Sequence, residues 1–181
     1  MGSTIDLNPV SRITAGCAGD PGQRSFYIQA RKDSTLVTLL CEKHQVQQLA
    51  QGVSKFVREL QEKFPNLDPA VVEYTETEMG LEEPIEFIFR VGQLGLGYDE
   101  DCDHLILVAK ELIEEDYDAH DAHDDAHDAA AVRLWASRSQ MLAMGAHGAE
   151  IAARGRPTCG NCLQPIDPRG HFCPKSNGYN N

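Results

Sequence analysis

The chain has 181 residues, of which 41% are hydrophobic and 24% are charged, and its formal net charge is −12. This length allows one compact domain with a small appendage and excludes larger architectures. No apolar run approaches the roughly 20 residues that cross a bilayer, and the N-terminus lacks the apolar segment of a signal peptide. We therefore expect a cytoplasmic protein that makes no membrane contact.

The negative charge is concentrated in one part of the chain. Twenty of the 28 acidic residues lie between positions 66 and 128, where Arg90 and Lys110 are the only Lys or Arg residues. The rest of the chain holds 8 acidic and 14 basic residues, a net charge of +6. Such segregation can indicate an anionic partner for the basic part. A solvated acidic insertion beside an ordinary, mildly basic domain is the simpler interpretation.

The first half of the chain predicts three strands followed by a helix. A short strand at 13–16 precedes the turn-rich GCAGDPGQR, the β-forming run SFYIQAR, a second turn and the strand LVTLLCEK. Apolar residues then recur at three- and four-residue intervals over 44–63, which places them on one face of a helix. These residues are Val46, Leu49, Ala50, Val53, Val57 and Leu60.

The second half repeats this order. FIFRVGQLGLGYD and HLILVAKE read as strands, and VRLWASR leads into a second helical stretch from Ser139 to Arg154. SFYIQARK aligns with HLILVAKE, and LVTLLCEKHQVQQL aligns with AVRLWASRSQMLAM, which pairs Lys43 with Arg138. We therefore expect an α+β fold in which two similar βββα units, antiparallel sheets with helices, pack together. Two unrelated meanders of similar length are the alternative.

The predicted organisation is a duplicated domain over residues 1–155 and a C-terminal zinc-ribbon tail over 156–181. The halves of the domain span about 10–64 and 85–155, and a surface connection, PNLDPAVVEYTETEMGLEEP, joins them.

An acidic insertion rich in His and Asp interrupts the second half at about 114–130. Its residues His120, His123 and His127 would share one face of a helix and could bind a divalent metal there. Low-complexity acidic runs are usually disordered, which favours a loop without metal.

The tail carries the most specific motif of the chain, with the spacing C-x2-C-x8-H-x-C. TCGNC has the form of a zinc knuckle, in which Gly160 and Asn161 permit a tight turn. Three thiolates and one imidazole would complete a tetrahedral site with no open position for water, so the predicted zinc is structural. A chance cluster in a disordered tail is the competing interpretation. The predicted ligands are Cys159, Cys162, His171 and Cys173.

Three segments carry a family resemblance: AGCAGDPGQRSFYIQAR, FRVGQLGLGYD and RPTCGNCLQPIDPRGHFCPKSNGY. Together they resemble the actinobacterial family catalogued as a domain of unknown function, number 3090, from about Arg12 to Tyr179. The resemblance implies no particular reaction. It also implies an acidic stretch of variable character at the insertion, which again favours a loop for the His-Asp repeat.

The turn GDPGQRSFY is the best candidate for a ligand site. Asp20 and Gly22 would form a turn from which Arg24 presents a guanidinium to a phosphate or carboxylate. A structural turn in which Arg24 pairs with a local acid is the simpler interpretation. We therefore expect a zinc-containing binding or scaffolding protein with a protein partner and no catalytic centre. The alternative is an enzyme that acts on a phosphorylated or otherwise anionic small molecule at this turn.

A third alternative is binding of single-stranded nucleic acid. Paired units of strands followed by a helix resemble, in outline, the Pur-alpha and whirly proteins, and Phe26, Tyr27 or Trp135 could stack on bases. The acidic insertion and the lack of a dense basic cluster argue against it. The basic residues that would contribute are Arg12, Arg24, Arg31, Lys32, Arg133 and Arg138.

Overall fold

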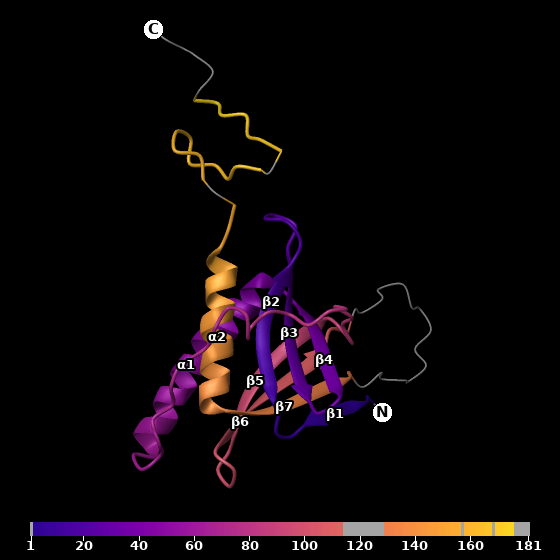
Figure 1. Cartoon of the computed structure of the whole chain (residues 1–181), viewed down its shortest axis with the longest axis vertical. Helices are drawn as coiled ribbons and strands as arrows, with labels where there is room; N and C mark the ends of the chain where they lie inside the picture. The colour runs from indigo at the N-terminus through magenta and orange to yellow at the C-terminus, as the bar shows by residue number, and fades with distance from the viewer. Residues whose placement is uncertain (1, 114–128, 157, 168, 176–181) are drawn as a thin grey trace, which may run out of the picture.

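The computed structural model describes residues 2–113, 129–156, 158–167 and 169–175. Two sheets and two helices form an α+β fold, as the sequence predicts, and a ribbon (158–167 and 169–175) projects beyond the second helix (Figure 1). The histidines of the His-Asp repeat lie outside the described residues. The elements are β1 (Thr4–Leu7), β2 (Arg12–Ala18), β3 (Ser25–Lys32), β4 (Thr35–Cys41), α1 (Lys43–Lys63), β5 (Val91–Asp99), β6 (His104–Glu111), β7 (Ala131–Ser137) and α2 (Arg138–Ala153).

One sheet has the strand order β2-β3-β4 and the other the order β1-β7-β6-β5. All neighbours are antiparallel except β1, which pairs in parallel with β7, Ile5 opposite Val132. The sequence did not predict β1, because the partner that stabilises this four-residue strand lies far along the chain.

The two sheets meet along both of their outer edges in the same manner. After β1 has paired with β7, the backbone N–H of Val10 donates to the carbonyl of Trp135 at 2.8 Å. At the other edge, the segment before β5 runs beside β4, where the N–H of Leu40 donates to the carbonyl of Phe89 at 3.1 Å. Each half therefore begins along the last strand of the other half.

The start of each helix repeats this relationship. Gln45 in α1 and Gln140 in α2 each accept a hydrogen bond from the N-cap backbone N–H, at 2.8 and 2.9 Å. Their amide nitrogens then reach across to the other half, Gln45 to the carbonyl of Val91 at 3.0 Å and Gln140 to that of Ser11 at 3.4 Å. The two aligned glutamines thus make equivalent contacts.

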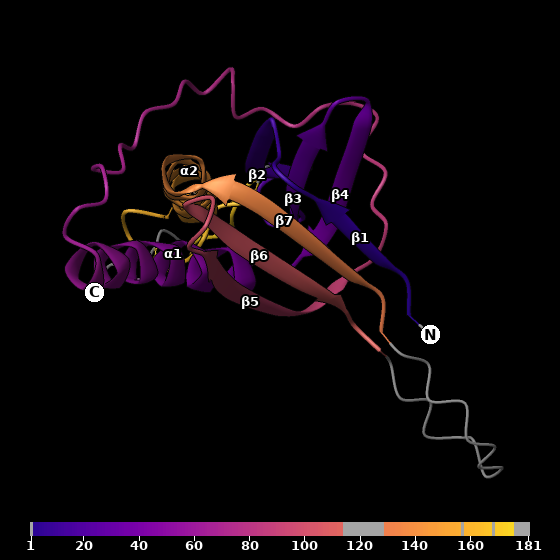
Figure 2. The same cartoon turned by 90° about the horizontal axis from the view of Figure 1, so that it is seen from below.

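The core lies between the two sheets and the helices, which sit side by side at one end of the sheets (Figure 2). Ile28 and Leu39 from one sheet and Leu105 and Leu107 from the other have no exposed surface. The apolar face predicted for α1 is buried in full, which confirms the helical period. No helix in the described part of the chain has the length and apolar character needed to span a membrane.

The acidic connection between the halves is pinned across the outer face of β2-β3-β4. Gln29 is fully buried, and its amide bonds both peptide groups of Glu82, donating to the carbonyl at 3.1 Å and accepting from the N–H at 2.8 Å. Thr14 is also buried and donates to the carbonyl of Met79 at 2.6 Å. Because buried polar groups require partners, these side chains hold in place a segment that the sequence predicts only as a surface connection.

The two helices approach closely at small residues of α2. A Cβ atom added at Gly145 would lie 3.3 Å from the Cα of Ala50, and one added at Gly148 would lie 2.9 Å from a methyl of Val46. These glycines therefore favour close packing, which offsets their weak helix propensity of about 1 kcal/mol relative to alanine.

Two glycine-to-alanine changes are expected to have opposite effects on stability. Gly148→Ala should lower the free energy of unfolding by about 1–3 kcal/mol, because the new methyl group overpacks the contact with α1. Gly52→Ala should raise it by about 0.5–1 kcal/mol, because its methyl group would meet Leu96 at an ordinary 3.7 Å. Urea unfolding of both variants measures the difference, and a shift of the two midpoints in the same direction would contradict the packing argument.

Candidate functional site

Four side chains of the ribbon come together as the sequence predicts. The ligand atoms of Cys159, Cys162, His171 and Cys173 all lie within 4.8 Å of one another. The Sγ atoms of Cys159 and Cys173 are 3.7 Å apart, and Cys162 Sγ is 3.0 Å from His171 Nε2. These separations suit a tetrahedral ion with bonds of about 2.0–2.3 Å, so this cluster could hold a metal ion.

The backbone of the knuckle prepares one of these thiols for a metal. Hydrogen bonds from the backbone of Cys162 and Asn161 lower the pKa of Cys159 to about 6, which favours the thiolate that binds metal. At the knuckle turn, the residue in the left-handed conformation is Leu163, with a φ of 61°, and not Gly160 or Asn161. The chain reverses after the second cysteine, where the N–H of Leu163 donates to the carbonyl of Cys159 at 2.9 Å.

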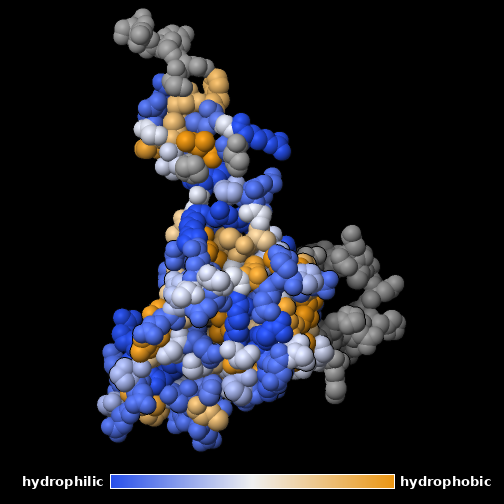
Figure 3. All heavy atoms as spheres, viewed as in Figure 1, coloured by the Kyte–Doolittle hydropathy of each residue, from blue (hydrophilic) through white to orange (hydrophobic). Residues whose placement is uncertain are grey.

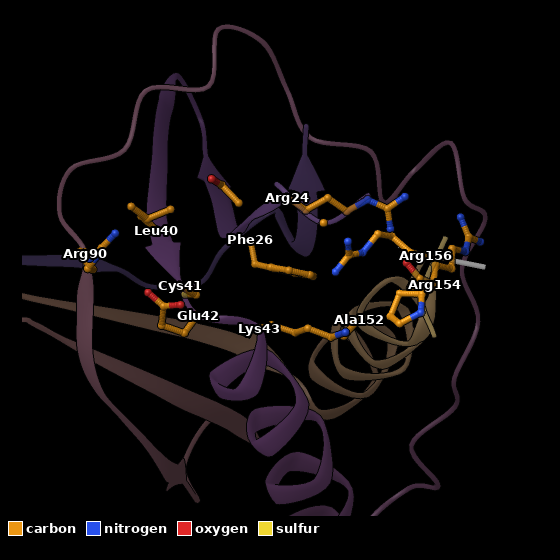
Figure 4. Close-up of a pocket in the computed structure, with 14 residues that line it drawn as sticks. Arg24, Phe26, Leu40, Cys41, Glu42, Lys43, Arg90, Ala152, Arg154 and Arg156 are labelled. Carbon is orange, nitrogen blue, oxygen red and sulfur yellow. Dashed lines mark hydrogen bonds between the residues drawn. The ribbon is translucent and has the colours of Figure 1, made fainter. Parts of the chain in front are cut away.

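A pocket of about 530 Å³ lies where the ribbon joins the domain. Its walls come from the start of β3, the end of β4, the start of α1, the end of α2 and Pro165 of the ribbon (Figure 4). Glu42 is the only acidic residue among the described residues that line it. Five cationic side chains surround this pocket, which we call the cationic pocket: Arg24, Lys43, Arg90, Arg154 and Arg156.

The cations are not spread evenly around the pocket. Arg24, Arg154 and Arg156 gather at the end beside the C-terminus of α2, and Lys43 extends towards them from the start of α1 (Figure 4). Arg90 lies at the opposite end. On the face seen in Figure 3, hydrophilic residues also lie at the narrow region between the ribbon and the domain.

Two of the five cations have a carboxylate partner among the described residues. Arg154 pairs with Glu76 and with Glu150, each at 2.6 Å, and these hydrogen bonds raise the pKa of Arg154. Arg156 pairs with Asp167 of the ribbon. Within the described part of the chain, no carboxylate forms an ion pair with the remaining three, which are Arg24, Lys43 and Arg90.

The residues of the predicted ligand turn divide between two pockets. Gly22 and Arg24 line the cationic pocket, whereas Asp20 lines an adjoining one that also includes Gly22 and Arg156. Among the described residues, Arg24 forms no ion pair with an acid, in contrast to the simpler interpretation of the sequence, and it donates instead to the backbone carbonyl of Arg154. Gly22 has a φ of 96° and leaves room for Arg156, whose side chain would lie 3.1 Å from an added Cβ.

Sequence reasoning did not identify four of the pocket cations: Lys43, Arg90, Arg154 and Arg156. They lie on separate segments that only the folded chain brings together. The available signal was the excess of basic residues outside positions 66–128.

Most residues proposed for nucleic-acid binding are engaged elsewhere. Phe26 is buried in the core, and Trp135 packs beneath Arg133, whose guanidinium carbon is 5.4 Å from the ring centroid. Among the six basic residues, only Arg24 and Lys32 form no ion pair with any described residue. The other four pair with carboxylates: Arg12 and Arg31 with Glu82, Arg133 with Asp6, and Arg138 with Asp103.

Of these four ion pairs, the one between Arg138 and Asp103 has the least exposed arginine. The side chain of Arg138 is 5% exposed and donates two hydrogen bonds of 2.8 Å to Asp103. It also donates to the carbonyl of Asp68 at 2.7 Å, and Tyr98 donates to Asp103 at 2.8 Å. The hydrogen bond from Arg138 lowers the pKa of Asp103 below its usual range.

Comparisons with known proteins identify a family but no characterised relative. A search of curated proteins and a search of solved structures each gave no match. The sequence model of the family described as "Protein of unknown function (DUF3090)" matches residues 5–173, a range that includes the pocket cations and all four potential metal ligands. Since this match spans most of the chain, the protein belongs to the DUF3090 family.

Proposed function

We propose that this protein binds a phosphorylated or otherwise anionic small molecule in the cationic pocket. The observation that carries the proposal is the convergence of five cations on one pocket in a chain whose net charge is −12. Of the cations at one end of the pocket, Arg24 and Lys43 have no carboxylate partner in the described chain, and without an anion their positive charges repel each other. Each charge-assisted hydrogen bond to a bound anion would contribute about 1.5–3 kcal/mol, which offsets that repulsion.

The pocket favours binding over covalent catalysis. Cys41 is the only thiol among its described lining residues, and burial raises its pKa to about 12, so the thiol stays protonated and is a poor nucleophile. His147 lies elsewhere, buried with Nδ1 2.8 Å from the carbonyl of Ala15. An enzyme at the Asp20–Arg24 turn would have an anion site but would need its nucleophile from the substrate or from water.

We further propose that the ion held by the ribbon is zinc and that its role is structural. Three thiolates and one imidazole form a ligand set typical of structural zinc, and four ligands leave no position for a reactive water. Pro165 lies between the second and third ligands in the sequence, and Arg156 lies three residues before the first. Both line the pocket, so a zinc-bound ribbon would hold one wall of the anion site.

We also infer that the halves arose by internal duplication. The equivalent contacts of Gln45 and Gln140, and the matching junctions at the two sheet edges, support this inference. Unrelated meanders would have no reason to share these side-chain contacts as well as their element order.

Thermal unfolding with matched ligands tests the proposed function. Inorganic phosphate and sugar phosphates should raise the unfolding temperature, whereas the corresponding sugars without phosphate should not. At a hundredfold excess over Kd the stabilisation is about 2.7 kcal/mol, which corresponds to several degrees for a chain of this size. Added salt should reduce the effect. If no phosphorylated compound stabilises the protein at millimolar concentration, the proposal is wrong.

A further inference from the structure

The two halves place different charges at equivalent positions. Asp103 is the last residue of the loop between β5 and β6, and Arg138 is the first residue of α2. Arg24 is the last residue of the loop between β2 and β3, and Lys43 is the first residue of α1. Alignment of β3 with β6 and of α1 with α2 sets Arg24 opposite Asp103 and Lys43 opposite Arg138. One half therefore has a carboxylate and a cation where the other has two cations.

In the second half, the internal carboxylate neutralises the cation. Asp103 receives two hydrogen bonds of 2.8 Å from the nearly buried guanidinium of Arg138. This bidentate geometry is the one by which arginine binds both carboxylates and phosphates.

In the first half, both cations line the cationic pocket. Neither Arg24 nor Lys43 forms an ion pair with a carboxylate of the described chain, and Glu42, which precedes Lys43 in the sequence and also lines the pocket, forms none with a described residue either. Among the described residues, the Arg24 side chain donates only to the carbonyl of Arg154, which leaves further guanidinium donors for a ligand.

We propose that the phosphate group of a phosphate monoester bridges Arg24 and Lys43, in the position that the Asp103 carboxylate occupies in the second half. This inference rests on the proposed function and narrows it to one subsite and one ligand class. A monoester carries a charge of about −1.5 to −2 at pH 7. That charge matches two cations, whereas a single carboxylate would neutralise only one of them.

The decisive variant gives the first half a carboxylate at the position that corresponds to Asp103 in the second half. Arg24→Asp places an acid beside Lys43, so it should weaken binding of inorganic phosphate by about tenfold to a hundredfold, as expected for the loss of one charge-assisted contact. Without phosphate, this variant should unfold at the wild-type temperature or higher. Lys43→Gln tests the subsite from the other side and should weaken phosphate binding while retaining a good helix former.

Arg58→Glu is the matched control, because it makes the same charge change at an exposed position of α1 outside the pocket. Calorimetric titration with inorganic phosphate, a sugar phosphate and acetate gives the affinities, and this control should bind phosphate as the wild type does.

The outcomes separate the subsite from the pocket. If Arg24→Asp and Lys43→Gln bind phosphate as tightly as the wild type while Arg156→Ala does not, the subsite is wrong and the anion pocket stands. If the wild type binds none of the anions, the proposed function itself fails. Tighter binding of single-stranded RNA than of any phosphate monoester would overturn the assignment of ligand class.

Discussion

Removal of the metal is expected to unfold the ribbon while the two sheets and both helices stay folded. Cys173 is the only buried apolar residue among the described residues of the ribbon, and Leu163 and Phe172 are 74% and 76% exposed. So small a segment has no hydrophobic core of its own, and metal binding worth about 10–16 kcal/mol in comparable zinc peptides would supply its folding free energy. Cys159→Ala should have the same effect as a chelator.

Amide hydrogen exchange and metal content measure this loss. Protein purified without chelator should contain about one equivalent of zinc, and Cys159→Ala should contain almost none. Protection should disappear in the ribbon and persist in β3 and β6. Cys102→Ala is the control, because Cys102 is exposed and lies outside the cluster. Less than about half an equivalent of zinc in the wild type would contradict the four-ligand site.

Loss of the Asp103 carboxylate is expected to destabilise the domain strongly for a change outside the hydrophobic core. Asp103→Ala should lower the free energy of unfolding by about 3 kcal/mol, because it leaves the nearly buried Arg138 guanidinium without its counter-ion. We take the lower end of the range for buried pairs because the Asp103 side chain is 40% exposed, so water screens the pair. Asp101→Ala, an exposed change in the same loop, should alter stability by less than about 0.5 kcal/mol.

The same pair predicts how stability depends on pH. The pKa of Asp103 is lowered in the folded protein from the ordinary value of 3.8, so the carboxylate stabilises the fold fully above that value. This contribution disappears as the pH falls below 3.8 and through the folded-state pKa. Asp103→Asn should therefore show a flatter fall in stability below about pH 4 than the wild type in urea unfolding at several pH values. If the stability of the two proteins falls equally steeply with pH, protonation of Asp103 is not coupled to unfolding.

Local patterns in the sequence were enough to predict much of the fold. The three- and four-residue spacing of apolar residues in α1 and the β-forming runs of β3 and β6 reflect periods that one element imposes on its own residues. The ligand spacing of the ribbon is equally local, since a knuckle and an extended segment bring four donors together within fifteen residues. Each of these features depends on residues close together in the chain.

Contacts between distant residues escaped sequence reasoning. β1 is stable only beside β7, and the acidic connection is held in place only because Gln29 and Thr14 are buried beneath it. The β-propensity of a four-residue run does not reveal which distant strand it pairs with, and a polar residue within a strand does not reveal which distant segment covers it.

The pocket shows most clearly how the information in the sequence differs from that in the tertiary structure. Composition revealed an excess of basic residues outside the acidic segment, and the turn at Gly22 indicated one cation, Arg24. The sequence therefore predicted the four clustered side chains of the ribbon, most of the element order and an excess of positive charge outside the acidic segment. The fold established where that charge meets, because the ends of β4 and α2 bring positions 24, 43, 90, 154 and 156 to one pocket. No local period links those positions, so only the packing of distant elements could place them together.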